Sequence, residues 1–278
     1  MKPCLSQTLT MPLAFADDVA RYSDVGCDAI EVWLPKLEQH LERHSVDDTR
    51  RLLEMRGMKL IAAAYKGGLL LSQGDARNAH HELFRRRLDI CQRFGIPTLI
   101  VAADFVDKIE RGDMDRAIVS LKQASQWAAG FDVTLALEFR GKGAFCASLD
   151  TALGLVHAAD EPNLGINLDV FHYYTGPSKF EDFAHLTPDR LAHVQLADLA
   201  GIPRELAADG DRILPGDGEF QLQPILEVLR RIGYSGWVSL EVTNPTLWRA
   251  QPAQVVEIAW TALRKVLGVT SSPVPDRS

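Results

Sequence analysis

Residues 164–169 read LGINLD, a short apolar run that ends in a carboxylate. The same form recurs at residues 133–138 (VTLALE), at residues 191–198 (LAHVQLAD) and at residues 237–241 (WVSLE). Short runs rich in Val, Leu and Ile that are bounded by helical patterns are typical of strands buried in a parallel sheet. The sequence therefore predicts parallel strands whose last residues are polar.

Eight such strands alternate with amphipathic stretches along the chain. The predicted strands are Cys4–Thr8, Ala29–Trp33, Lys59–Ala64, Thr98–Ala102, Val133–Glu138, Leu164–Asp169, Leu191–Ala197 and Trp237–Glu241. The predicted helices are Asp47–Arg56, Asp75–Phe94, Asp115–Ala129, Ser148–Ala158, Gln221–Ile232 and Pro252–Leu267. Alternation of this kind implies βαβ units, and eight strands close a (β/α)8 TIM barrel. A doubly wound open sheet is the alternative, but residues 7–10 (QTLT) lack the glycines expected after its first strand.

Length and composition are those of one globular domain. The chain has 278 residues, of which 46% are hydrophobic and 24% are charged. We expect a single barrel domain over residues 1–270 and a mobile polar tail over residues 271–278. The formal net charge of −7 argues against nucleic acid and anionic membranes as partners.

The sequence shows no pattern typical of a targeting signal. Its cysteines are scattered along the chain. No stretch approaches the roughly 18 consecutive apolar residues of a membrane span, and residues 1–8 contain no signal-peptide core. The four cysteines form no CxxC pair, which is typical of reduced thiols. We therefore expect a cytoplasmic protein.

Four consecutive predicted strands carry a polar residue at the carboxyl end: Glu138, Asp169, Gln195 and Glu241. The carboxyl ends of barrel strands form the catalytic face, where three carboxylates repel one another unless a cation lies between them. A single strand-end carboxylate often simply meets solvent, but four in succession favour a metal site. An oxygen-only ligand set suits Mn²⁺ or Mg²⁺, with Co²⁺ and Zn²⁺ as alternatives.

Further polar and aromatic residues fall where they could meet a substrate. His172 follows Asp169 by three residues and is either a donor to substrate oxygens or a loop histidine bonded to the backbone. Arg212 precedes a glycine-containing turn and is either a bidentate substrate ligand or a solvated side chain. Three more residues lie after early strands and are candidate substrate contacts: Trp33, Tyr65 and Lys66.

With these residues, the chain resembles the xylose isomerase-like TIM-barrel superfamily, over roughly residues 5–267. The superfamily contains sugar phosphate isomerases and epimerases, inosose dehydratases, 3-dehydroshikimate dehydratases and family-2 AP endonucleases. The segments that carry the resemblance are residues 135–138 (LALE), 167–172 (NLDVFH), 193–198 (HVQLAD), 215–218 (PGDG) and 239–241 (SLE). The resemblance implies that Glu138, Asp169, Gln195 and Glu241 are metal ligands and that the two glutamates also transfer protons. It also implies that His172 and Arg212 contact the substrate.

One position separates the branches of the superfamily. Most epimerases have His where this chain has Gln195, whereas the dehydroshikimate dehydratases resemble this chain in HVQLAD (residues 193–198). Those dehydratases, however, have an arginine in the loop after strand three, where residues 63–68 read AAYKGG. Lys66 would replace that arginine as a point charge without its forked geometry.

The expected function is therefore a divalent-metal-dependent sugar or sugar phosphate isomerase or epimerase. Its substrate would be a ketose-like or cyclic polyhydroxy-ketone molecule that reacts through an enediolate, with Glu138, Glu241 and His172 as catalytic groups. A dehydratase of the 3-dehydroshikimate or inosose type is the alternative. A non-catalytic sugar-binding barrel and an AP endonuclease-like repair enzyme are more remote; the latter needs extra histidines that strands three and four lack. Barrels of this superfamily often form homodimers, although the sequence identifies no dimer surface.

Overall fold

The computed structural model describes residues 1–65, 67–105 and 108–269. Its eight parallel strands pair in chain order and β8 pairs with β1, so the sheet closes into a barrel. The strands are β1 (Lys2–Ser6), β2 (Ala29–Trp33), β3 (Lys59–Tyr65), β4 (Thr98–Ala102), β5 (Thr134–Glu138), β6 (Leu164–Asp169), β7 (Leu191–Leu196) and β8 (Trp237–Leu240). The predicted TIM barrel is confirmed, and only β1 is displaced by as much as two residues from its predicted range.

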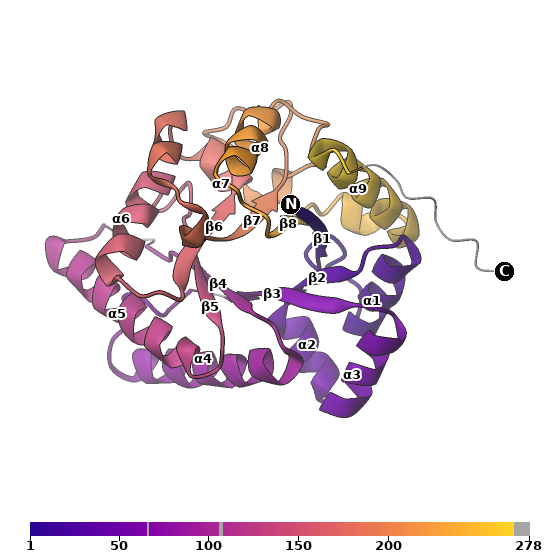
Figure 1. Ribbon diagram of the computed structural model, residues 1–278, viewed down its shortest axis with the longest axis horizontal. Helices are drawn as coiled ribbons and strands as arrows, with labels where there is room; N and C mark the ends of the chain where they lie inside the picture. The colour runs from indigo at the N-terminus through magenta and orange to yellow at the C-terminus, as the bar shows by residue number, and fades with distance from the viewer. Residues whose placement is uncertain (66, 106–107, 270–278) are drawn as a thin grey trace.

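Helices surround the strands (Figure 1). They are α1 (Phe15–Asp24), α2 (Leu34–Leu41), α3 (Val46–Met55), α4 (Gly74–Phe94), α5 (Arg111–Ala129), α6 (Leu149–Ala159), α7 (Val170–Thr175), α8 (Leu222–Arg231) and α9 (Pro252–Leu267). The helical pattern did not predict α1, α2 or α7. Both α2 and α7 follow a strand without an intervening loop, so that no turn residues mark the change.

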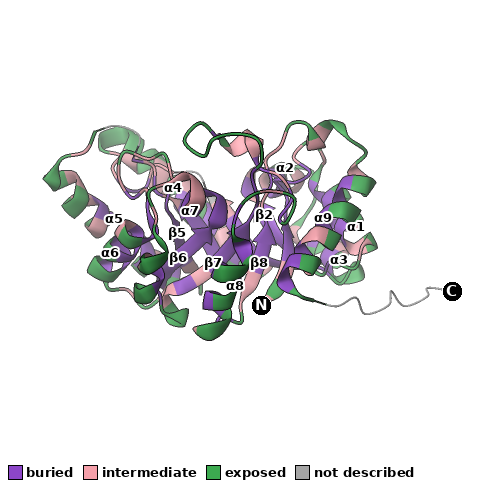
Figure 2. Ribbon diagram, turned by 90° about the horizontal axis from the view of Figure 1, so that it is seen from above, coloured by how far each residue is buried: buried purple, intermediate pink, exposed green. Residues whose placement is uncertain are grey.

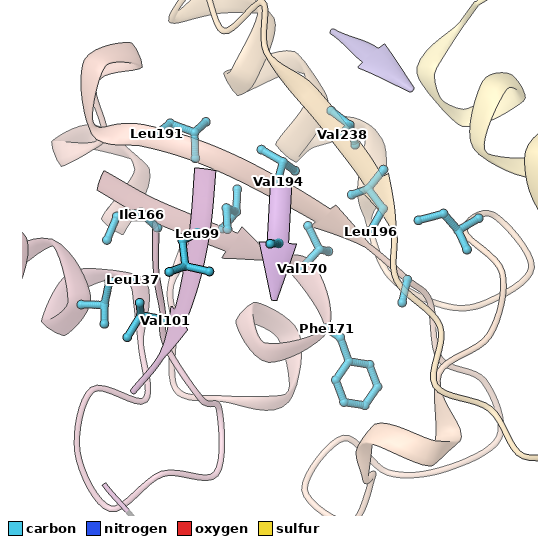
Figure 3. Packing of buried hydrophobic residues seen from close by; sticks show 14 of the residues in the cluster. Leu99, Val101, Leu137, Ile166, Val170, Phe171, Leu191, Val194, Leu196 and Val238 are labelled. Carbon is cyan, nitrogen blue, oxygen red and sulfur yellow. The ribbon is translucent and has the colours of Figure 1, made fainter. Parts of the chain in front are cut away.

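The large apolar cluster lies between the strands and the helices. Figure 2 shows buried residues concentrated in the strands and exposed residues on the outer faces of the helices. Figure 3 shows members of this cluster at close range, among them Leu137, Ile166 and Val194 from β5, β6 and β7. Because side chains alternate along a strand, the residues next to these in sequence face the interior of the barrel.

The barrel interior changes in character from one end to the other. A small separate cluster of mostly short side chains includes Ala29, Ile100 and Ala136. Glu138 lies two residues after Ala136 in β5, so both side chains are on the same face of the strand. Buried polar residues that include Glu31 and Ser239 lie in the strands as well. The interior is therefore apolar at one level and polar toward the carboxyl ends of the strands.

Several local features agree with the sequence pattern. The Ser45 side chain accepts a hydrogen bond from the backbone N–H of Asp48 at the start of α3, and Gly95 ends α4 in the left-handed conformation that favours glycine. The four cysteines are free and buried. Among the described residues, none of the helices combines the length and the apolar character that a membrane span requires. The predicted tail at residues 271–278 lies outside the described residues.

Candidate active site

A cavity of about 600 Å³ opens at the carboxyl ends of the strands. Its wall combines aromatic side chains with charged ones. The aromatic residues are Trp33, Phe105 and Phe171. The charged residues and the histidine are Asp104, Glu138, Arg140, Lys142, His172, Asp209 and Glu241. A mostly closed pocket with an apolar wall and convergent polar groups is the usual form of a small-molecule site.

Three carboxylates from three strands meet at this end of the barrel, and two of them, Glu138 and Glu241, line the cavity. Glu138 and Asp169 are the last residues of β5 and β6, and Glu241 directly follows β8. Asp169 is fully buried, and the side chains of Glu138 and Glu241 are only 10% and 12% exposed. Their position at the strand ends is the one that the sequence predicts. The alternative, in which each carboxylate simply meets solvent, does not fit this burial.

Arg212 lies among these carboxylates, and its side chain is 2% exposed. Its Nη1 and Nη2 atoms donate to Asp169 Oδ1 and Oδ2 over 3.1 and 2.7 Å, which is a bidentate contact. Nη1 also lies 3.1 Å from Glu241 Oε2, and the guanidinium carbon lies 4.3 Å from the centre of the Phe171 ring. The solvated-loop alternative for Arg212 is therefore wrong.

His172 lies in the first turn of α7, directly after β6. Its Nε2 atom lies 3.5 Å from Glu138 Oε1 and 3.5 Å from Asp169 Oδ2. The ring is buried, and its contacts are with charged side chains of the site, including Arg212 Nη2 at 3.4 Å. His172 thus lies in a helix and beside the strand-end carboxylates, not in a loop as the alternative had it, and its contact with a substrate stays a prediction.

Two charged residues extend the cluster toward the cavity mouth. Asp209 Oδ1 accepts from Arg212 Nη2 over 3.2 Å, and Asp209 Oδ2 accepts from Arg140 Nη2 over 2.8 Å. Arg140 Nη1 lies 3.6 Å from Glu138 Oε1. We call the carboxylates of Glu138, Asp169, Asp209 and Glu241 the carboxylate cluster. Within the described residues, four carboxylates thus contact two guanidinium groups, which leaves an excess of two negative charges.

The pKa values in the cluster reflect this excess. Burial raises the pKa of Glu138 to about 7, and Asp169 adds to the shift while Arg140 opposes it. Burial likewise raises the pKa of Glu241 well above its usual range, against the opposing charge of Arg212. Burial would also raise the pKa of Asp169, but Arg212 outweighs it and holds that pKa low. The two carboxylates with raised pKa values are those that a further cation would stabilise in the charged form.

The histidine is held neutral. Burial lowers the pKa of His172 to about 4; the Arg212 and Arg140 charges add to that shift and Asp169 opposes it. A neutral imidazole can accept at one ring nitrogen and donate at the other, or can ligate a cation. Glu138, Asp169 and His172 each offer one ligand atom, and these three atoms lie within 4.8 Å of one another.

The donor set fits a divalent cation. Glu241 Oε2 is buried and has no hydrogen-bond partner in the described part of the chain, although Arg212 is near it. A buried carboxylate oxygen without a hydrogen bond, in a cluster where carboxylates outnumber guanidinium groups, is the environment that a bound cation relieves. The surrounding oxygen donors suit hard ions.

Gln195 occupies the predicted position on β7, in register with Asp169 on β6. It contributes to the cavity wall, but its amide is hydrogen-bonded to two residues in the barrel interior. The Nε2 atom donates to Glu31 Oε1 over 2.9 Å, and the Oε1 atom accepts from Asn167 Nδ2. Its role as a metal ligand stays a prediction.

The structure describes only some of the remaining predicted substrate contacts. Trp33 ends β2 and lies in the cavity wall. Tyr65 ends β3, but its side chain lies outside the description. Lys66 lies outside the described residues altogether. Asp198 accepts hydrogen bonds from backbone N–H groups of its own loop and so orders it.

Sequence reasoning missed five charged residues of the cavity and the network below it: Glu31, Asp104, Arg140, Lys142 and Asp209. Two of them had a signal, because Arg140 and Lys142 follow Glu138 by two and four residues and therefore lie in the loop above β5. Asp209 stands three residues before Arg212, but nothing local marks it as its partner. Glu31 sits within an apolar strand, and only the closed barrel brings it to β7.

Comparisons with known proteins agree with this geometry. Residues 19–265 match the sequence model of the family described as xylose isomerase-like TIM barrel. The chain belongs to this family. It is therefore a member of a family of isomerases, epimerases and dehydratases, and it is an enzyme.

Individual relatives cover almost the whole chain. An inosose isomerase of Halalkalibacterium halodurans is 26% identical over 93% of this chain and 94% of its own. A 3-dehydroshikimate dehydratase of Pseudomonas aeruginosa is 24% identical over 89% of this chain and 39% of its own. A solved structure of a protein named IOLI, which contains a zinc atom, superimposes with a TM-score of 0.88 at 23% identity, over 96% of this chain and 98% of its own. At that identity the structure shows the shared fold.

Proposed function

We propose that this protein is a divalent-metal-dependent isomerase of a cyclic polyhydroxy-ketone or a related ketose. The observation that carries the proposal is the carboxylate cluster, whose members from β5, β6 and β8 meet beside a cavity and, when ionised, leave two negative charges in excess. The similarity to inosose isomerases along nearly the full length of both chains supports this substrate class.

The residues that would hold the metal are Glu138, Asp169 and Glu241, with the carbonyl oxygen of Gln195 as the fourth donor. A divalent ion at this place would polarise a substrate carbonyl and thereby acidify the neighbouring C–H bond. Mn²⁺ or Mg²⁺ suits the oxygen donors, and the zinc in the related structure keeps Zn²⁺ and Co²⁺ among the candidates.

Glu138 and Glu241 are placed for proton transfer at two sides of the substrate. They come from β5 and β8, which are three strands apart in the closed barrel. One carboxylate removes a proton from the carbon beside the carbonyl, and the other delivers a proton from its own side. Such an exchange moves the carbonyl or inverts a carbon without adding or losing atoms.

The other charged groups bind and orient the substrate. His172 is neutral and adjacent to Glu138, so it can donate to a substrate oxygen or accept from a hydroxyl. Arg212 donates a hydrogen bond to Asp169 and so holds that carboxylate in place, and the guanidinium of Arg212 packs on the ring of Phe171. Trp33 and Phe105 give the apolar wall against which the carbon face of a sugar-like ring can pack.

A metal-dependent dehydratase is the second candidate. The HVQLAD segment around Gln195 and the similarity to a 3-dehydroshikimate dehydratase favour it. The first step, removal of the proton beside the carbonyl, is common to both reactions. In the dehydratase, the glutamic acid that took this proton would pass it to a departing hydroxyl group, and neutral His172 would assist the departure by a hydrogen bond, so that water leaves.

The test is a product assay on the purified protein with Mn²⁺. Inososes, ketoses and 3-dehydroshikimate are each incubated with protein and analysed by proton NMR. The proposal expects an isomer of equal mass from an inosose or ketose, and no product after the metal is chelated. Loss of water from the substrate would establish the dehydratase instead, and full turnover with the chelator present would overturn the metal-dependent mechanism.

A further inference from the structure

A second polar network lies inside the barrel beneath the carboxylate cluster, and the proposed reaction does not use it. Glu31 of β2 is completely buried and reaches across the barrel to β7. Its Oε2 atom lies 2.8 Å from His193 Nε2, and its Oε1 atom accepts from Gln195 Nε2 over 2.9 Å. We call Glu31, His193, Gln195 and Asn167 the interior network.

The burial of this network needs an explanation other than stability. His193 is 2% exposed and Gln195 is 1% exposed, so the whole contact is removed from solvent. A buried carboxylate with a histidine is often no more stable than an apolar pair of the same volume. Networks of this kind instead impose one orientation on the groups that they contact.

The group that can change orientation is the amide of Gln195. An amide has a donating and an accepting end of nearly the same size, so only its hydrogen bonds decide which way it faces. The carboxylate of Glu31 takes the Nε2 end, and Asn167 donates to the Oε1 end. Because an ionised carboxylate can only accept, the contact with Glu31 selects this orientation, and the donating end of Asn167 is compatible with it.

The selected orientation matters because Gln195 lies beside the carboxylate cluster. Its register partner on β6 is Asp169, a member of the carboxylate cluster. A carbonyl oxygen has two lone pairs, of which Asn167 occupies one. The second remains for a cation, whereas a reversed amide would turn N–H groups toward that cation.

We propose that Glu31, anchored by His193, is a positioning residue that makes Gln195 offer its oxygen and not its nitrogen to the metal. The inference rests on the proposed metal site. It adds that a network across the barrel, and not the local sequence around Gln195, decides which end of this amide faces the metal site. Partners behind a metal ligand typically change metal affinity about 10- to 100-fold when they are altered.

The test measures Mn²⁺ affinity by titration calorimetry or by electron paramagnetic resonance, without substrate. Glu31→Gln keeps the volume but leaves one accepting oxygen where the carboxylate has two, one toward His193 and one toward Gln195. The orientation of the Gln195 amide is then no longer fixed. We expect Mn²⁺ affinity to fall about tenfold or more. The matched control is Glu38→Gln, which removes the charge of a glutamate paired with Arg87 outside the cavity and should leave Mn²⁺ affinity unchanged.

A double-mutant cycle separates positioning from a general structural effect. In Gln195→Leu there is no amide to orient, so Glu31→Gln should cause no additional loss of Mn²⁺ affinity in that background. Equal losses in the presence and absence of the Gln195 amide would overturn the inference. If Glu31→Gln does not fold, Glu31→Met fills a similar volume without any accepting oxygen and should lower Mn²⁺ affinity alike; wild-type affinity in that variant would likewise contradict the proposal.

A further variant keeps the two proposals distinguishable. Glu241→Gln removes a member of the carboxylate cluster and should abolish Mn²⁺ binding. If it does so while Glu31→Gln binds Mn²⁺ like the wild type, the positioning role is wrong and the metal site stands. If Glu241→Gln also binds Mn²⁺ normally, the metal site itself is wrong.

Discussion

Arg212 shows how one buried charge can be essential to the cluster in which it lies. Its guanidinium is paired with both oxygens of Asp169, which is itself fully buried. Removing one partner of a buried ion pair leaves the other charge uncompensated, which costs about 3 to 5 kcal/mol.

We therefore expect Arg212→Met to lower the free energy of unfolding by about 3 kcal/mol or more in the absence of metal. Chemical denaturation monitored by circular dichroism measures this change. Arg231→Met, which removes an exposed arginine at the end of α8, is the control and should change the free energy of unfolding by less than about 0.5 kcal/mol. A loss below about 1 kcal/mol for Arg212→Met would show that Asp169 does not depend on this pair.

Gln195 allows a second test at the scale of one residue. Gln195→His replaces an oxygen donor by an imidazole nitrogen, which Zn²⁺ and Co²⁺ bind more readily than Mn²⁺ does. We expect the ratio of Zn²⁺ to Mn²⁺ affinity to rise in this variant, as measured by competitive metal titration. An unchanged ratio would remove Gln195 from the metal ligands.

At the scale of elements, the loop between β7 and α8 determines where Arg212 lies. Asp198 organises this loop, because its carboxylate accepts from the backbone N–H groups of Leu199, Gly216 and Phe220. The segment around Arg212 is also tied back to Asp198 through a backbone bridge to Ile213. The loop is therefore held by one buried side chain.

Asp198→Ala should leave these N–H groups, of which those of Leu199 and Phe220 are buried, without their partner. Each unsatisfied buried group costs about 1 to 3 kcal/mol, so we expect a loss of about 3 kcal/mol in the free energy of unfolding together with an increase in KM. Ser148→Ala removes a helix cap away from the cavity and should cost only about 1 kcal/mol, with KM unchanged. An unchanged KM in Asp198→Ala would show that the loop keeps its place without the carboxylate.

The sequence predicts the elements well where the local pattern is sufficient. Strand-end residues such as Glu138 and Asp169 can be recognised because the apolar run before them fixes both the strand and its direction. The partner of such a residue cannot be predicted in the same way. The contacts of Arg212 and of Glu31 join segments that are far apart in the chain, and no local pattern encodes the closure that brings them together.

For the whole molecule, a bound metal should stabilise the folded state. The ligand set exists only when β5, β6 and β8 are in place, so a metal binds the folded chain and raises its stability by mass action. The melting temperature should rise with Mn²⁺ concentration and fall to the metal-free value after chelation, as measured by differential scanning calorimetry. Glu241→Gln should show no such rise; a rise equal to that of the wild type would place the metal elsewhere.

The most direct test of the central claim is proton exchange at the carbon beside the substrate carbonyl. Purified protein with Mn²⁺ is incubated in deuterated water with inososes, ketoses and 3-dehydroshikimate, and proton NMR follows the loss of the signal at that carbon. We predict exchange with at least one of these substrates, and none after Glu241→Gln or after chelation of the metal. Exchange that persists in Glu241→Gln without metal, or no exchange with any substrate in the metal-loaded wild type, would contradict a metal-dependent enediolate mechanism.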